Sequence, residues 1–444
     1  MSIVVSSSFI CLVVSFLGWT RATFASGAQH ITNLCQSLGY LVGSSQNCQI
    51  HQSIRGGQTS SRTRRIFGIL VRRRAWPGQA GTMACLTSCL DGMKRASWMN
   101  ENTAITNTEF RTNSLRGQRP CVLRCAAVSL RGNYPEKPAG YENQDAYTIE
   151  EGGDGVLTGV FDGHGEYGDD CAAFVRENIG ETLSAECEAQ GESSVDWGSV
   201  LTKTFQRLNK KMHKDSDFDD ELSGTTAVVA YYGEGAIWLA QVGDSRAVLG
   251  TVEDDVLSSR ALLQDQTPFR KDERARVREA GAEVMSFGQR MKKQSEPDDV
   301  YWEKREDAMD ADAQAGAFKL VGGEPRVWAP DEEKPGCAFT RSLGDAYGER
   351  FGVIAEPEIL RYELSEGDRF VFMCSDGVHD FLTNQTVCSL IEESGALAPD
   401  APPDAPLAAC RAVVAEAYRL WLTHDVRSDD ITITLVLIDP ATDE

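Results

Sequence analysis

The first 90 positions of the chain contain no acidic residue, and Asp91 is the first one. Residues 1–120 hold 13 lysines and arginines against three acids, whereas residues 121–444 carry a formal net charge of −32. Nonspecific nucleic-acid binding needs a cationic surface for the phosphates, so the acidic body argues against a nucleic-acid partner. A metal-dependent nuclease or polymerase would need a basic groove, and the same scarcity of cations argues against that class.

The chain also lacks an apolar run in its head that is long enough for a confident membrane span. Residues 9–19 have the length of a signal peptide, and the small residues 25–28 that follow are a candidate cleavage site. Residues 44–75 are rich in serine, glutamine and arginine and free of acid, which is typical of organelle transit peptides. We expect residues 1–120 to be a targeting or disordered extension, with any membrane contact made through the apolar segment. A signal anchor, or an over-extended reading frame whose true start is Met83, are the competing interpretations.

The thirteen cysteines are an odd number and lack zinc-ribbon spacing. Cys85 and Cys89, like Cys121 and Cys125, are separated by three residues, and no histidine cluster accompanies them. A closed disulfide framework cannot include every cysteine, so a reducing compartment is favoured: the cytosol, the nucleus or an organelle interior.

Alternating apolar segments in the body predict strands and helices. The pattern predicts strands at residues 126–131, 146–150, 155–161, 225–232, 236–242, 369–374 and 431–438, and helices at residues 170–189, 199–214, 271–280 and 410–424. Gly233-Glu234-Gly235 predicts a hairpin. Residues 285–336 are polar and are expected to form an insertion or flap.

Aspartates stand at the ends of three of these apolar runs. Asp162 and Asp376 close two of them, Asp429 lies just before the last, and Asp145 opens another predicted strand. Carboxylates at such places are costly unless a positive group meets them, and no lysine or arginine lies beside Asp162 or Asp376. A bound cation is the natural partner, and oxygen ligands favour Mg²⁺ or Mn²⁺ over zinc.

Further motifs lie between the aspartates in a characteristic order. They are residues 223–227 (SGTTA), 242–247 (VGDSRA) and 339–345 (FTRSLGD). Together with the aspartates, the set closely resembles the metal-dependent Ser/Thr protein phosphatase family (PPM, protein phosphatase type 2C), over about residues 126–439. The resemblance implies an α+β fold, a four-layer α-β-β-α sandwich with two central antiparallel sheets and a binuclear metal site between them. It places a phosphatase domain at residues 121–444 and implies phosphoprotein substrates; we expect a monomer.

Hydrolysis of a phosphate monoester is slow because the anionic ester repels a nucleophile, and two metal ions remove this obstacle. Asp162 and Asp376 can bridge or cap the pair of ions, Asp429 completes the second, and the carbonyl of Gly163 is a neutral ligand. His164 follows directly and is placed to protonate the departing oxygen as a general acid. The resemblance implies the same roles. It adds Asp145, directly or through water, and a weaker third ion held by Asp244, Asp376 and Asp380.

The chain departs from the best-known family pattern near Asp145. Gly140 stands where many members carry an arginine that grips the substrate phosphate, and Gln144 replaces a common glutamate. The phosphate-binding residue is therefore not assigned, with Arg131 and Lys137 as candidates. We expect a protein serine/threonine phosphatase. The alternative is a catalytically weak binding module that uses the fold to regulate a kinase or receptor.

Overall fold

A computed structural model describes residues 3–4, 11–12, 103–116, 119–135, 141–152, 155–191, 195–215, 217–303 and 323–440. The chain divides into two units, Met1–Glu101 and Asn102–Glu444. In the first unit, the described strands β1 (Ile3–Val4) and β2 (Cys11–Leu12) pair antiparallel. Among the described residues, no helix has the length and apolar character needed to cross a membrane.

The second unit contains two large antiparallel sheets. The six-stranded sheet runs in the order β11-β10-β17-β18-β4-β3. Its strands are β3 (Thr103–Arg116), β4 (Arg119–Leu130), β10 (Arg246–Glu253), β11 (Val256–Ala261), β17 (Asp368–Cys374) and β18 (Ile431–Pro440). The strand β18 lies in the middle, paired with β17 on one side and β4 on the other.

The seven-stranded sheet runs in the order β15-β7-β6-β8-β9-β16, and β5 also pairs with β6. Its strands are β5 (Asp145–Gly152), β6 (Gly155–His164), β7 (Gly224–Thr225), β8 (Ala227–Gly233), β9 (Ala236–Val242), β15 (Leu343–Gly344) and β16 (Glu358–Tyr362). Glu234 and Gly235 connect β8 to β9 with positive φ angles of 51° and 81°, which confirms the predicted hairpin.

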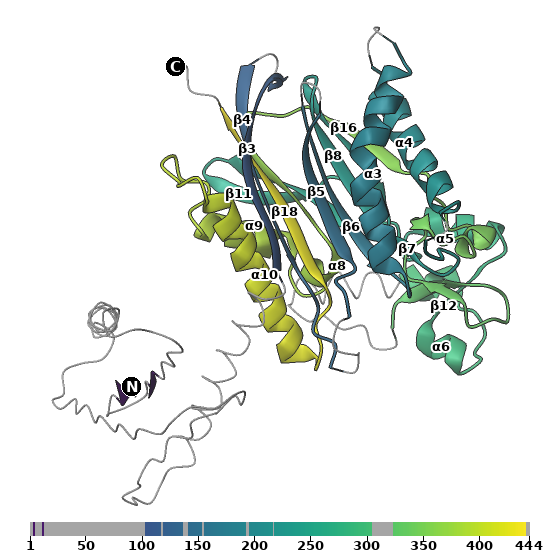
Figure 1. The fold of residues 1–444 in the computed structure, drawn as a ribbon. Coiled ribbons are helices and arrows are strands. Elements are labelled where there is room, and N and C mark those ends of the chain that lie inside the picture. Colours follow the sequence, from purple (N-terminus) through teal and green to yellow (C-terminus); the bar gives the residue numbers. More distant parts are fainter. Residues whose placement is uncertain are drawn as a thin grey trace, which may run out of the picture. The chain divides into compact units, whose positions relative to one another are not determined.

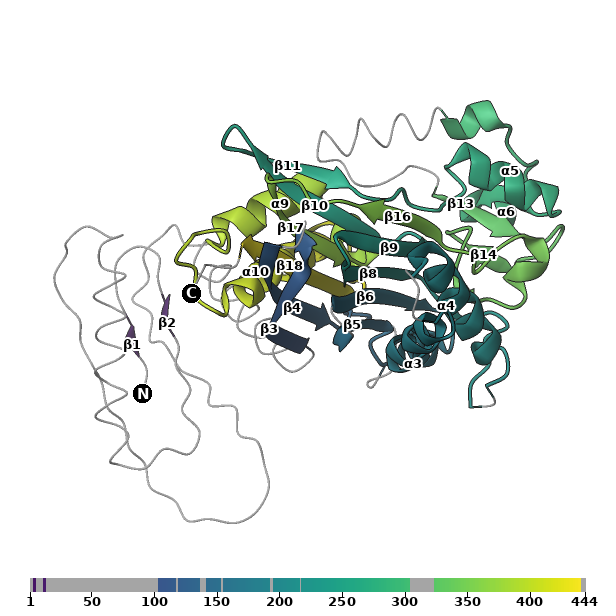
Figure 2. The same cartoon turned by 90° about the horizontal axis from the view of Figure 1, so that it is seen from above.

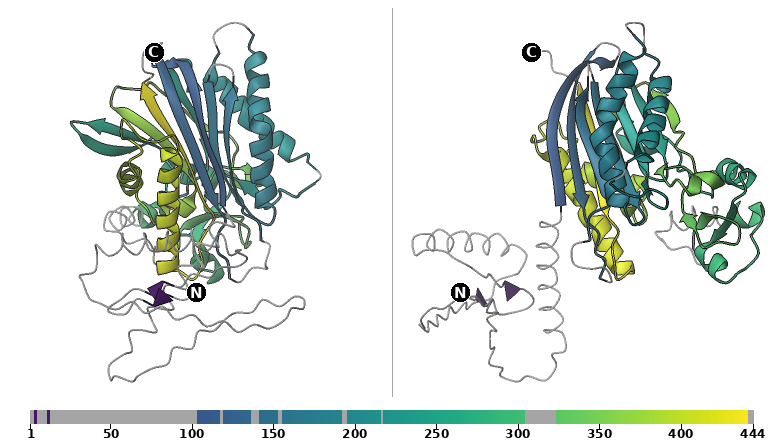
Figure 3. Two further views of the ribbon diagram at one scale, coloured as in Figure 1. Left: turned by 60° about the vertical axis from the view of Figure 1, so that its left-hand side comes forward. Right: turned by 45° about the vertical axis from the view of Figure 1, so that its right-hand side comes forward.

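Helices cover the outer face of each sheet, so the second unit has the four layers expected from the resemblance (Figure 1). The helices α3 (Gly168–Glu188) and α4 (Trp197–Met212) pack on the seven-stranded sheet, while α9 (Asn384–Glu393) and α10 (Ala405–His424) pack on the six-stranded one. Figures 2 and 3 show the same layering from other directions.

Apolar side chains fill the space between the two sheets. Val160 and Leu239 from the seven-stranded sheet meet Leu249, Val371 and Val436 from the six-stranded one, and all five are at most 1% exposed. Each fully buried side chain of this size contributes about 1.5–3 kcal/mol to folding. This core fixes the two sheets against each other, and the strand ends are therefore held in fixed relative positions.

The folded unit begins earlier than the charge pattern suggests. The predicted extension ended at residue 120, but β3 (Thr103–Arg116) pairs with β4 along most of its length and completes the sheet. Hydrogen bonding to β4, rather than net charge, decides where the domain starts. The expected targeting function of the remaining head stays a prediction.

A smaller unit, here called the flap, projects beside the sandwich. It consists of α5 (Lys271–Glu279), β12 (Glu283–Ser286), α6 (Phe287–Met291), β13 (Pro325–Trp328) and β14 (Pro335–Cys337). Its core joins Val277 to Val284, Trp302 and Val327, so the flap includes α5 and extends beyond the predicted bounds of 285–336. Residues 304–322 of the predicted insertion lie outside the described residues.

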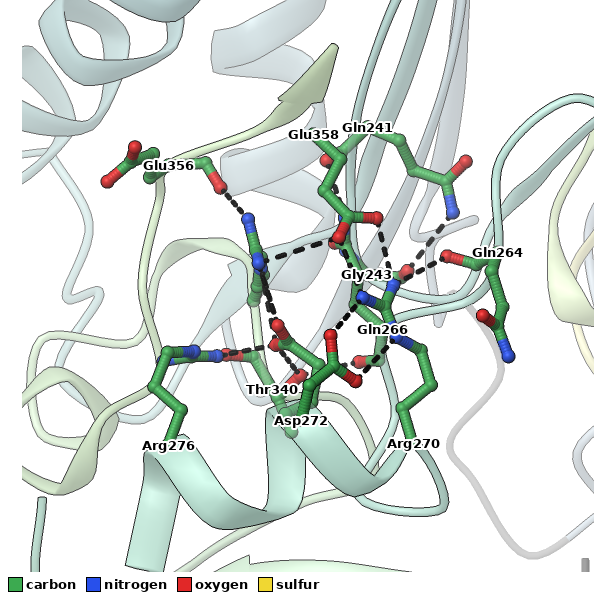
Figure 4. A network of polar contacts seen from close by, with 12 residues as sticks. Gln241, Gly243, Gln264, Gln266, Arg270, Asp272, Arg276, Thr340, Glu356 and Glu358 are labelled. Atoms are coloured by element: carbon green, nitrogen blue, oxygen red, sulfur yellow. Dashed lines mark hydrogen bonds and ion pairs between the residues drawn. The ribbon is translucent and has the colours of Figure 1, made fainter. Parts of the chain in front are cut away.

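Arginines fasten the flap to the sandwich through a group that we call the flap anchor (Figure 4). It comprises Asp272, Glu273 and Glu358 with Arg270, Arg276 and Arg341. Arg270 contacts both Asp272 and Glu358 at 2.7 Å, and Arg341 contacts Glu273 at 2.7 Å. One carboxylate oxygen from each of the three acids lies within 4.8 Å of the other two.

Candidate metal centre

The four aspartates expected to bind metal lie at neighbouring strand ends of both sheets. Asp145 opens β5 and stands opposite Asp162 of β6 in the antiparallel register. Asp376 begins the short helix α8 (Asp376–His379) directly after β17, and Asp429 stands two residues before β18. We call these four residues the metal centre.

Electrostatics show that the aspartates face one another. Burial raises the pKa of Asp162 well above its usual value, and the charges of Asp145 and Asp429 raise it further. Burial also raises the pKa of Asp376, followed by the charges of Asp162 and Asp429. The leading charges on both groups are carboxylates, so a cation is the partner that would allow all of them to be ionised together.

The two carboxylate oxygens of Asp145 have different surroundings. Its Oδ2 accepts a hydrogen bond of 2.7 Å from the hydroxyl of Ser375, whereas its Oδ1 is buried and has no hydrogen-bond partner among the described residues. Burial, and next the charge of Asp430, raise the pKa of Asp145 to about 8. An unpaired buried oxygen in a group of carboxylates fits a hard divalent ion.

The neighbouring residues Asp429 and Asp430 accept hydrogen bonds from different parts of the chain. Asp430 accepts hydrogen bonds from the backbone N–H groups of Gly132, at 2.5 Å, and Gln144, at 2.8 Å, and so ties β18 to the segment before β5. Asp429 accepts from the backbone N–H of Asp430 and from the hydroxyl of Tyr134. Nothing in the sequence around Tyr134 predicts this contact.

Tight backbone packing explains Gly163. A Cβ atom there would lie 2.0 Å from the carbonyl oxygen of Gly168 and 2.6 Å from that of Gln144. The glycine is therefore required by the meeting of α3 with the loop before β5, in addition to any approach to an ion. Its N–H donates to the Gln144 carbonyl at 3.0 Å.

The proposed ligands of a third ion form a neighbouring group. Burial raises the pKa of Asp244 to about 6, followed by the charges of Asp265 and Glu324. Burial raises the pKa of Asp380, followed by the charges of Glu324 and Asp429. The ring of His379 contacts the Asp244 carbonyl at 3.0 Å and holds this loop against α8. Glu324, which stands directly before β13, is a further acidic group near these two aspartates that the sequence analysis did not single out.

His164 ends β6 at the edge of the metal centre. Its Nε2 lies 2.7 Å from Oδ2 of Asp345, its ring packs on Phe339 with 4.4 Å between ring centroids, and its side chain is 25% exposed. The motif that contains Asp345, residues 339–345, is visible in the sequence, but nothing in it indicates a contact with His164. The structure gives this aspartate a specific partner.

Of the two departures near Asp145, Gln144 makes structural contacts. Gln144 donates to the Gly165 carbonyl at 2.9 Å and accepts from the hydroxyl of Tyr141 at 2.6 Å. Arg131 donates to the Tyr141 carbonyl at 3.0 Å. Lys137 and Gly140 lie outside the described residues, so the candidate phosphate-binding residue stays unassigned.

Comparison with known proteins points to one family. The sequence model described as Protein phosphatase 2C matches residues 143–420. "Probable protein phosphatase 2C 35" of Arabidopsis thaliana is 39% identical, over 72% of this chain and 85% of its own length. "Probable protein phosphatase 2C 72" of the same plant is 31% identical, over 67% and 81%.

Two solved structures share the fold. "Crystal structure of serine-threonine phosphatase 2C from Toxoplasma gondii" has a TM-score of 0.53 at 16% identity, with 75% of this chain and all of that chain covered. "Structure of a C.elegans sex determining protein" has a TM-score of 0.51 at 21% identity, with 70% and 64% covered.

Proposed function

Because the chain belongs to the protein phosphatase 2C family, we propose that it hydrolyses phosphoserine and phosphothreonine in proteins with the help of Mg²⁺ or Mn²⁺. The observation that supports this most is the metal centre itself. Four aspartates from two sheets meet there, and burial and neighbouring carboxylates raise the pKa values of three of them. A binding module has no need for such a costly arrangement.

The residues divide the work in the proposed reaction. Asp162, Asp376 and Asp429 hold the two ions, with the carbonyl of Gly163 and the free Oδ1 of Asp145 as further ligands. When bound, the ions neutralise the phosphate and lower the pKa of a bridging water. Asp244, Asp376 and Asp380 are proposed to hold a weaker third ion.

His164 is proposed as the general acid. Phosphoserine and phosphothreonine leave as alkoxides of high pKa, which need a proton as the bond to phosphorus breaks. His164 follows the proposed ligand Gly163 in the chain, at the edge of the metal centre, and its side chain is 25% exposed.

The test measures hydrolysis of a phosphothreonine peptide and of p-nitrophenyl phosphate by the purified chain, after EDTA and after added Mn²⁺, Mg²⁺ or Ca²⁺. We expect Mn²⁺ and Mg²⁺ to restore turnover and Ca²⁺ to fail, because its loose geometry polarises a bridging water poorly. A chain that binds Mn²⁺ and hydrolyses neither substrate would instead favour the phosphatase-fold binding module.

For the head, we propose delivery to a membrane-bounded compartment. An apolar segment at residues 9–19 followed by an acid-free arginine-rich and serine-rich stretch is read by import machinery. Residues 1–82 fused to a fluorescent protein should redirect it. A signal as diffuse as that of the unfused reporter would favour Met83 as the true start.

A further inference from the structure

We propose that Tyr134 is the positioning residue of Asp429: its hydroxyl holds one carboxylate oxygen, Oδ1, and thereby leaves the other, Oδ2, to bind the metal ion that Asp429 completes. The inference rests on the proposed metal centre. It adds a residue that does not touch the ion but orients one of its ligands, and it names the ligand oxygen.

The two carboxylate oxygens of Asp429 differ in their contacts. Oδ1 accepts two hydrogen bonds, one from the hydroxyl of Tyr134 and one of 2.9 Å from the backbone N–H of Asp430. Oδ2 accepts none from the residues that the structure describes. An ionised carboxylate oxygen has two acceptor positions and no hydrogen to give, so the phenol is the donor and Oδ1 is already satisfied. Oδ2 is therefore the oxygen that is available to a cation.

The same division of the two oxygens occurs at Asp145. Its Oδ2 accepts a 2.7 Å hydrogen bond from the hydroxyl of Ser375, whereas its Oδ1 is buried and has no hydrogen-bond partner among the described residues. At Asp145 and at Asp429 alike, a hydroxyl group holds one oxygen and leaves the other to an ion. Hydrogen-bond partners of this kind orient metal ligands in proteins generally.

Backbone pairing places the tyrosine beside the metal centre. Asn133 and Ser428 form an antiparallel bridge, in which the N–H of each donates to the carbonyl of the other at 3.1 and 3.0 Å. The carboxylate of Asp430 accepts from the N–H of Gly132 at 2.5 Å. The residues on both sides of the proposed ligand are thus joined to the two residues that precede Tyr134.

A glycine and a second aromatic ring support the phenol. A Cβ atom at Gly132 would lie 2.6 Å from the ring of Tyr134 and 2.8 Å from the carbonyl carbon of Asp429, so only a glycine lets both lie against this backbone. The ring of Tyr134 packs edge to face on that of Tyr141, with 5.3 Å between centroids and 75° between planes. The donor is therefore held in place by the fold itself.

Tyr141 provides a matched control. Its hydroxyl donates to the side-chain oxygen of Gln144 at 2.6 Å, instead of to an expected metal ligand. Tyr134→Phe and Tyr141→Phe each remove one hydroxyl from the same pair of rings. If the tyrosines only pack the loop, the two substitutions should have the same consequence for metal binding.

The experiment measures Mn²⁺ binding by isothermal titration calorimetry. It compares the purified full chain with Tyr134→Phe, Tyr141→Phe, Asp429→Asn and the double variant Tyr134→Phe/Asp429→Asn, after urea unfolding in EDTA has shown that each variant is folded. We expect Tyr134→Phe to raise the Kd of one Mn²⁺ ion by about 10- to 100-fold, the loss typical for a hydrogen-bond partner of a metal ligand. Hydrolysis of p-nitrophenyl phosphate by this variant should need correspondingly more Mn²⁺.

The other variants test whether the effect passes through Asp429. Tyr141→Phe should bind Mn²⁺ about as tightly as the wild type. In the double variant, loss of the Tyr134 hydroxyl should add little to the loss caused by Asp429→Asn, because the tyrosine acts through that carboxylate.

The outcomes separate this inference from the proposed function. A wild type that binds no Mn²⁺, or an Asp429→Asn variant that binds it as tightly as the wild type, would overturn the metal centre and the role of Tyr134 together. Unchanged Mn²⁺ affinity in Tyr134→Phe, beside a loss in Asp429→Asn, would overturn the role of Tyr134 alone. Equal losses in the two phenylalanine variants, or fully additive losses in the double variant, would do the same, since the tyrosine would then support only the loop.

Discussion

The metal centre and the flap anchor both gather acidic side chains, and the pKa values of the two groups move in opposite directions. In the metal centre, burial and neighbouring carboxylates raise the pKa of Asp145, Asp162 and Asp376. In the flap anchor, burial alone would raise the pKa of Glu273, but hydrogen bonds from Arg341 and Arg276 lower it to about 2.

The difference teaches how to distinguish a cation site from a salt-bridge network. The carboxylates of the flap anchor lie close enough to hold an ion, yet arginines already neutralise them. Hydrogen bonds from Arg270 lower the pKa of both Asp272 and Glu358. Proximity of acidic oxygens is therefore insufficient evidence for a metal, and the absence of a nearby basic group is the better sign.

The largest expected effect concerns turnover. Asp162→Asn or Asp376→Asn removes one charge from a shared ion, and we expect hydrolysis of p-nitrophenyl phosphate to fall by at least about 10³-fold. Glu273→Gln in the flap anchor serves as the comparison, because it should leave metal-dependent turnover detectable. Activity of either aspartate variant within a few-fold of the wild type would contradict the metal assignment.

The next largest effect is on stability, and here we expect the flap anchor to be the more sensitive of the two groups. Glu273→Gln leaves Arg276 and Arg341 without their buried partner, and the free energy of unfolding should fall by about 3 kcal/mol. Lys271→Gln removes an exposed pair with Glu303 and should cost less than about 1 kcal/mol. Urea unfolding of both variants measures the contrast, and equal losses would show that the anchor is no stronger than a surface pair.

Binding of ions should stabilise the metal centre alone. At Mn²⁺ concentrations of about 100 times Kd, each site adds about 2.7 kcal/mol to the free energy of unfolding. The wild type should show this gain in thermal unfolding, Glu273→Gln should keep it, and Asp376→Asn should lose most of it. A gain that survives in Asp376→Asn would place the ions elsewhere.

The smallest effect is the response of the metal-free protein to pH. The folded-state pKa of Asp145 is about 8, above its unfolded value, so the folded state binds this proton more tightly and stability should rise as the pH falls from 8 towards 5. The contribution of Glu273 to stability changes with pH in the opposite direction. Its folded pKa of about 2 gives stability above its unfolded pKa, which is lost as the pH falls from about 5 to 2.

Unfolding measured from pH 8 to 2 in EDTA should therefore pass through a maximum. With Mn²⁺ bound, the rise on acidification should disappear, because protons then compete with the ions. If the free energy of unfolding in EDTA instead declines steadily as the pH falls from 8, the pKa of Asp145 is not raised in the folded protein.

The sequence could predict that the four aspartates meet because three of them stand at the ends of apolar runs and Asp145 opens another predicted strand. Such runs indicate buried strands, and the order of the motifs indicated the family and therefore a shared metal site. The contact between His164 and Asp345 could not be predicted in this way. It depends on paired segments of two residues, Gly224–Thr225 and Leu343–Gly344, which are too short to show periodicity.

Other parts were missed for related reasons. The strand β3 was assigned to the head because arginines and the scarcity of acids set the boundary, although its pairing with β4 depends on neither. The flap's strands have three or four residues each, which is too short to show an alternating pattern. Where tertiary pairing rather than local pattern decides the structure, a single sequence carries little signal.

The place of β18 has a consequence for how the protein is made. This strand is the last one in the described chain, yet it lies between β17 and β4 in the middle of its sheet, and it begins two residues after Asp429. During synthesis, the edges of β17 and β4 stay unpaired until β18 has left the ribosome, and unpaired edges invite association with other chains. The nascent chain therefore completes this sheet and places Asp429 at nearly the same time, so we expect a chain cut short before Asp429 to be prone to aggregate.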